Sequence, residues 1–132
     1  VGVVEKAAVI RYTVAADREK LGIQPLAMST TYHDLAEIRA YECSVQWSHT
    51  RPNGEPWYRI FYDYNRVPYG RNTGENLVKE FTSVFIGYQG LYNSNGHYEN
   101  MMNPHFTEVA IAIYYDENGI AYSAHLFFGE LQ

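Results

Sequence analysis

The sequence predicts an α+β domain in which helical segments come first and an antiparallel hairpin closes the chain. Residues 109–115, VAIAIYY, form an apolar run of the kind found in a buried central strand. The DENG segment follows, and Asn118-Gly119 suits a hairpin turn because both residues tolerate positive φ. Residues 120–128 return as the partner strand. Helices followed by a hairpin are typical of the α+β class.

The composition is that of one globular domain, and we expect residues 1–132 to form it. Hydrophobic residues make up 46% of the chain and charged residues 19%, which argues against disorder. The net charge of −5, without a run of Lys or Arg, argues against a nucleic-acid partner. No apolar run is long enough for a transmembrane helix. The single cysteine, Cys43, excludes an internal disulfide and a cysteine-based metal cluster.

Two helices are predicted in the first third of the chain. The first covers about residues 4–21, where apolar residues recur at helical spacing, and Gly22 suits the C′ position after it. Thr31 with Asp34 resembles a capping box at the start of the second. Its inner face is predicted to consist of Leu35, Ile38 and Val45.

The middle of the chain alternates loops with helical patterns. Residues 48–56, SHTRPNGEP, form a predicted loop, and residues 57–65, WYRIFYDYN, a short aromatic helix. Residues 66–74, RVPYGRNTG, are predicted to be another loop. From Asn76, apolar residues at helical spacing predict a helix that continues to Leu91. The chain has 13 tyrosines, which suit either wet clefts and contact surfaces or the edge of a small core.

Three residues on predicted loops or element ends could carry chemistry: His49, Glu75 and His97. The Asn95-Gly96 pair is a turn signal, so we expect His97 to lie at the lip of a cleft that the other two face. Two imidazoles and one carboxylate suffice for a catalytic-type zinc site with an open position for water. They equally suit a general acid/base set.

Each of these residues also has a structural alternative. Glu75 can accept backbone N–H groups at the start of the helix predicted from Asn76, and His97 can be a satisfied turn histidine. Cys43 is predicted to be a small buried hydrophobe. The other histidines are predicted to be structural or solvated: His33, His105 and His125.

Five segments in order carry a resemblance to a known family: REKLGIQPL, LAEIRAYE, SHTRPNG, GEN, and NSNGHYENMMNP followed by FTEVAIAIYYDENG. They resemble the CAP superfamily (cysteine-rich secretory proteins, antigen 5 and pathogenesis-related 1 proteins), in particular its disulfide-free bacterial SCP-like branch. A single piece such as GEN is weakly specific, whereas five in register with these separations are strongly specific.

The resemblance implies a three-layer α-β-α sandwich with a central antiparallel sheet. It also implies a ligand-binding cleft in which His49, Glu75 and His97 hold a divalent cation such as Zn²⁺. We expect no organic cofactor. The second glutamate of the family's cleft falls at Ser94 here. This change removes one charge and leaves a more open site.

Two classes of function follow. The first is a secreted bacterial binding module whose cleft binds a peptide, glycan, lipid or protein ligand, with or without a metal. The alternative is a zinc-dependent, protease-like hydrolase in which His49 and His97 hold the metal and Glu75 is the third ligand or general base. The sequence contains no G-x-S-x-G nucleophile elbow, which favours the binding module over the enzyme.

A third possibility within the superfamily is a sterol or lipid carrier, which requires an apolar groove that no sequence pattern displays. For every class we expect an extracellular or cell-surface location, with a signal peptide removed before Val1.

Overall fold

The computed structural model describes residues 14–79 and 95–130. Residues 14–20 are helical. The following elements are β1 (Ala27–Met28), α2 (His33–Val45), the 3₁₀ helix η1 (Trp57–Arg59), α3 (Ile60–Asp63), β2 (Arg71–Lys79), α5 (Asn95–Met102), β3 (Phe106–Tyr115) and β4 (Ala121–Glu130).

The four strands form one sheet in the order β1-β3-β4-β2. β3 and β2 both pair antiparallel with β4, and the short β1 pairs parallel with β3. β4 is buried at nine consecutive positions, so it requires a partner on each of its edges. β2 supplies the second partner through nine residue pairs and forms one edge of the sheet.

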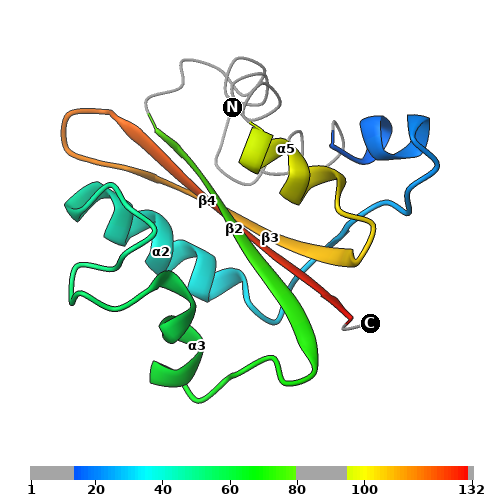
Figure 1. Ribbon diagram of the computed structural model, residues 1–132. Helices are drawn as coiled ribbons and strands as arrows, with labels where there is room; N and C mark the ends of the chain where they lie inside the picture. The colour runs from blue at the N-terminus through cyan, green and yellow to red at the C-terminus, as the bar shows by residue number, and fades with distance from the viewer. Residues whose placement is uncertain (1–13, 80–94, 131–132) are drawn as a thin grey trace.

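Alternate residues of the strands face two separate apolar layers. On one face, Ala110, Ala112 and Leu126 pack with Leu35 of α2 and Phe61 of α3. On the other face, a second cluster joins the sheet to helical residues 14–20 and to α5 through Val14, Met101, Val109, Ile111 and Phe127. Figure 1 shows α2 and α3 on one side of the sheet and α5 on the other. The predicted α-β-α sandwich is therefore confirmed.

Several local predictions are confirmed as well. Gly22 has φ of +72°, and the amides of Gly22 and Ile23 bond back to the carbonyls of Glu19 and Arg18, as in a Schellman cap. The aromatic segment forms η1 and α3. The β3–β4 hairpin turns at 116–120, where Gly119 alone of the Asn-Gly pair has positive φ.

The start of α2 differs from its prediction. The N-cap position is Tyr32, with no side-chain cap, because Asp34 pairs with Arg66 instead of closing a capping box. Val45 is 61% exposed, so it does not belong to the inner face. The buried face of α2 consists of Leu35, Ala36, Arg39, Ala40 and Cys43.

The largest correction concerns residues 71–79, which were predicted as the end of a loop and the start of a helix. They form strand β2 because pairing with β4 satisfies the backbone of both strands. The rest of the predicted helix, up to Leu91, lies outside the described residues. Gly96 also differs, since Asn95–Met102 is helical and Asn95-Gly96 lies in its first turn. His97 is therefore held by a helix and not by a turn.

Candidate functional site

Glu75 is a fully buried carboxylate in the middle of β2, and its side chain faces α2. Arg39 of α2 donates two hydrogen bonds to it, from Nε to Oε2 at 2.7 Å and from Nη2 to Oε1 at 3.0 Å. Both side chains have 0% exposure. A bidentate guanidinium–carboxylate pair is a strong and geometrically specific contact. Arg39 therefore fixes the orientation of Glu75 and compensates its charge, and both carboxylate oxygens accept hydrogen bonds. Glu75 is in this sense a fixed anchor.

His49 is attached to this anchor but remains open to solvent. Its Nδ1 lies 2.8 Å from Oε1 of Glu75, while its side chain is 55% exposed. The loop that carries it is closed by a hydrogen bond from the Trp57 amide to the His49 carbonyl at 2.8 Å. The contact with Glu75 fixes the orientation of the ring and leaves Nε2 available to another molecule.

His97 approaches from the other face of the sheet. Glu75 and Asn76 are neighbours in β2, so their side chains point to opposite faces. Asn76, which is fully buried, donates from Nδ2 to the His97 carbonyl at 3.1 Å, and Asn100 donates to Asn76 Oδ1 at 2.8 Å. These amide contacts fasten the start of α5 to the edge strand. Asn76 and Asn100 are thus positioning residues for His97.

Three histidines influence one another electrostatically: His49, His97 and His125. Burial lowers the pKa of His97, and the positive charge of protonated His49 lowers it further. Burial lowers the pKa of His125 to about 3, with a smaller contribution from His97. His125 lies in β4, and its Nε2 is 2.9 Å from the hydroxyl of Ser123. His97 is therefore an electrostatic neighbour of both the exposed His49 and the buried His125.

We call His49, Glu75 and His97 the His/Glu cluster, because His49 contacts Glu75 and lies near enough to His97 to lower the pKa of its imidazole. Among the residues that the structure describes, no group of three His, Cys, Asp or Glu side chains is arranged to hold a metal ion. Glu75 already gives both oxygens to Arg39, and the guanidinium places a positive charge beside them. In this arrangement the cluster does not fit a three-ligand zinc ion. Zinc binding stays a prediction, and it would require Glu75 to exchange Arg39 for the metal.

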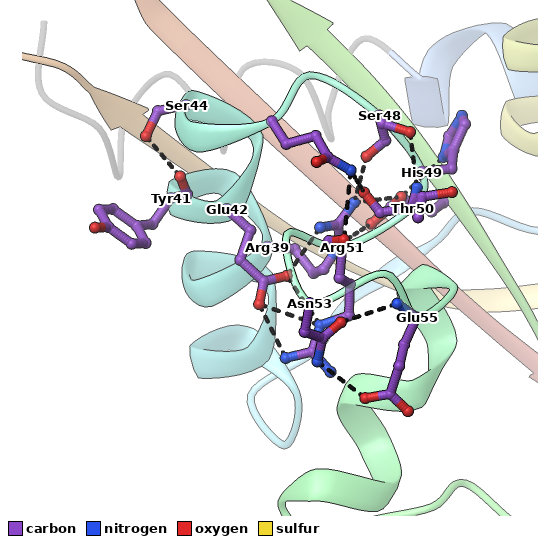
Figure 2. Close-up of polar contacts among 12 residues, drawn as sticks. Arg39, Tyr41, Glu42, Ser44, Ser48, His49, Thr50, Arg51, Asn53 and Glu55 are labelled. Atoms are coloured by element: carbon purple, nitrogen blue, oxygen red, sulfur yellow. Dashed lines mark hydrogen bonds and ion pairs between the residues drawn. The ribbon is translucent and has the colours of Figure 1, made fainter.

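Behind the cluster lies an ion network that the sequence patterns did not predict. Glu42 of α2 accepts from Arg39 at 2.9 Å and from Arg51 at 2.9 and 3.1 Å, and Arg51 also binds Asp63 of α3 at 2.5 Å. Figure 2 shows Glu42 between the guanidinium groups of Arg39 and Arg51. A signal was present in LAEIRAYE, because Arg39 falls on the apolar face of a helix, where a charge needs a buried partner.

The remaining residues considered in the sequence differ in their exposure to solvent. Ser94 lies outside the described residues. His33 is 44% exposed and lies 3.7 Å from Glu37, in agreement with its prediction. His105 is half-buried before β3, and its amide bonds to Asn103. Cys43 is buried, and burial raises its thiol pKa to about 12, which suits a small core residue.

The comparisons with known proteins identify the family. The model of the cysteine-rich secretory protein family, CAP, matches residues 11–128, so the chain belongs to this family. No curated protein sequence matches the chain well enough to count as a relative. Within the described residues, no helix is long and apolar enough to cross a membrane.

Three solved bacterial structures have this fold. An outer surface protein from Borrelia burgdorferi superposes with a TM-score of 0.82 at 19% identity, covering 96% of this chain and 94% of that one. An extracellular protein with an SCP domain from Bacillus anthracis gives 0.83 at 19% identity, covering 97% and 41%. A cysteine-rich secretory protein from Staphylococcus aureus gives 0.78 at 19% identity, covering 97% and 40%. The chain thus spans about two-fifths of the last two proteins.

Proposed function

We propose that this CAP domain is a secreted bacterial binding module whose His/Glu cluster contacts a peptide, glycan or lipid ligand. The observation that carries the proposal is the state of His49, whose ring is 55% exposed while Nδ1 is held 2.8 Å from a buried carboxylate. An exposed imidazole in a fixed orientation loses little entropy when a ligand binds. Its Nε2, for which the described residues supply no partner, can donate or accept a hydrogen bond.

The second histidine supports the same proposal. His97 is half-buried on a helix that Asn76 and Asn100 fasten to the edge strand. The cluster therefore combines a loop imidazole held by a buried carboxylate with an imidazole on a helix, and fixed side chains of this kind suit a preorganised binding site. Secretion is supported by the family, which is named for secretory proteins, and by neighbours described as outer surface and extracellular proteins.

The zinc-dependent hydrolase is the second candidate, and one observation favours it. The His49–Glu75 contact has the form of a general base oriented by a carboxylate. Against it, Glu75 is neutralised by Arg39 and is not free to act as a base or a metal ligand in this arrangement. The binding module uses the cluster as it stands, so it is the function that the geometry supports better.

The first experiment follows the imidazole signals of His49 and His97 by NMR while three probes are added separately. The probes are a pool of casein peptides, chitotetraose, and phosphatidylglycerol vesicles. A ligand of the cluster shifts both imidazoles saturably, and His49→Ala abolishes the response, whereas His33→Ala, a solvated histidine, retains it. If no probe moves either imidazole signal, the proposed binding module is wrong for all three ligand classes.

Two further measurements address the cation and the enzyme. Zinc is titrated by calorimetry into metal-stripped protein, with His97→Ala and His33→Ala alongside. Saturable binding that disappears only in His97→Ala assigns the ion to the cluster, and equal affinity in all three proteins refutes a cluster site. Turnover of casein or an ester panel that is lost in Glu75→Gln would favour the hydrolase instead.

A further inference from the structure

A pocket of about 260 Å³ lies between α3 and the start of β2, and none of its lining residues belongs to the His/Glu cluster. All of them come from residues 58–73, the segment that runs from the aromatic helix through the following loop into β2. Figure 1 shows this loop passing below α3 and turning into the first residues of β2. The pocket is therefore a local feature of one continuous stretch.

Three apolar residues of the pocket lining are packed into the protein: Phe61, Val67 and Pro68. Phe61 is 2% exposed, and its ring meets Phe128 of β4 edge-on, with centroids 5.7 Å apart. Val67 packs against the same core cluster, and Pro68 is buried. The apolar part of the lining is therefore packed into the core and held in place by it.

Three tyrosines line the pocket, two of them about half exposed and the third mostly exposed. Tyr58 is 47% exposed, Tyr62 49% and Tyr69 84%. Tyrosine offers a large, rigid contact area with a polar tip at a low entropic cost. Tyr32, by contrast, stacks on Phe128 with centroids 4.4 Å apart and is largely covered. The Arg59 guanidinium lies over one face of the Tyr62 ring, 4.3 Å from its centroid, so Tyr69 is the most accessible ring of the three.

The remaining lining groups are polar and nearly neutral in sum. Thr73 contributes a hydroxyl, and Arg71 contributes a guanidinium that is held 3.0 Å from Glu108 and 3.7 Å from Glu130. The two carboxylates compensate the positive charge of Arg71. An anionic ligand would therefore find little net attraction here, whereas hydroxyl groups would find donors and acceptors.

We infer that this pocket binds one pyranose ring of a neutral glycan. A pyranose has a weakly positive C–H face, which suits the negative face of an aromatic ring, and hydroxyl groups around its edge. The cavity holds the volume of roughly nine water molecules, which is room for one sugar ring and not for a chain of them. An aromatic peptide side chain would contact the apolar lining but would form no hydrogen bonds with the tyrosine hydroxyls or with Thr73.

The wall formed by α3 is preorganised by the ion network described above. Asp63 at the end of α3 binds Arg51, and Arg51 binds Glu42 of α2 through two nitrogens. α3 is only four residues long, so these contacts fix a helix that would be marginal alone. A sugar therefore meets a wall that is already in place.

The test adds chitotetraose or maltotetraose to the full 132-residue chain and follows the protein signals by NMR. We expect one or both sugars to shift the ring signals of the pocket tyrosines and the amide of Thr73, with a Kd of about 1 mM. Tyr69→Ala should weaken binding roughly three- to tenfold. Tyr41→Ala is the matched control, because Tyr41 is 50% exposed on α2 and does not line the pocket.

The outcomes separate this inference from the proposed function. Shifts at the pocket tyrosines without shifts at His49 and His97 support the sugar site, whatever the cluster binds. Equal weakening by Tyr41→Ala and Tyr69→Ala would overturn it, as would the lack of any saturable response to either sugar. Saturation of the same signals by N-acetyl-phenylalanine amide and not by the sugars would assign the pocket to a peptide side chain and refute the inference.

Discussion

Replacing Arg39 with Met tests how strongly the buried pair supports the site. The change leaves the Glu75 carboxylate at 0% exposure, with His49 as its remaining side-chain partner among the described residues. Breaking a buried ion pair from one side costs about 3–5 kcal/mol, because an uncompensated charge stays in the interior. The domain's free energy of unfolding is expected to be about 5–15 kcal/mol. Arg39→Met should therefore remove a large share of the stability.

The structure also predicts an order among related variants. Glu75→Gln should cost less than Arg39→Met, because Arg39 keeps Oε1 of Glu42 at 2.9 Å and the Ser48 carbonyl at 3.0 Å. Arg39→Met combined with Glu75→Leu should be more stable than Arg39→Met alone, since it buries no charge without a partner. Arg66→Met is the control, because its partner Asp34 is 57% exposed and such surface pairs contribute about 0–1 kcal/mol.

Urea denaturation at neutral pH, followed by circular dichroism, measures all five proteins. Equal losses of stability in Arg39→Met and Arg66→Met would contradict the role assigned to the buried pair. A further loss of stability on adding Glu75→Leu to Arg39→Met would contradict it as well. In either case Glu75 would be reached by water or by another cation in solution, and it would not be the fixed anchor of His49.

Two further predictions concern the backbone and the buried histidine. Gly129→Ala should lower the free energy of unfolding by about 3 kcal/mol or more, because the added Cβ would lie 1.7 Å from the His105 carbonyl oxygen. Gly96→Ala on α5 should leave that free energy unchanged or raise it by up to about 1 kcal/mol, because the space around its Cβ is open. Thermal denaturation measures both changes. Burial lowers the pKa of His125 from 6.5 in the unfolded chain to about 3 in the folded protein, so the unfolded chain takes up a proton first as the pH falls. The free energy of unfolding should therefore fall by about 1.4 kcal/mol per pH unit from pH 6.5 down toward pH 3. Urea titrations at several pH values should show a shallower slope in His125→Gln, and an unchanged slope would assign the proton uptake to another group.

Local patterns in the sequence predicted the elements whose signals are short-range. Gly22 ends the first helix because positive φ closes a Schellman cap, and that requirement involves only neighbouring residues. The apolar run of β3 and the Gly119 turn are local in the same sense. β2 could not be found in this way, because its strand form depends on nine pairings with β4, about 50 residues further along the chain.

The candidate site shows the same division. The sequence by itself determined which residues carry imidazole and carboxylate groups, and its ordered motifs indicated the family and the sandwich. Only the tertiary structure decided which contacts those groups make, because strand alternation places Glu75 toward Arg39 and Asn76 toward α5. The charge of Glu75 is consequently compensated inside the protein, and His49 is left fixed and exposed. Pairing between distant segments sets this outcome, and no short-range pattern contains it.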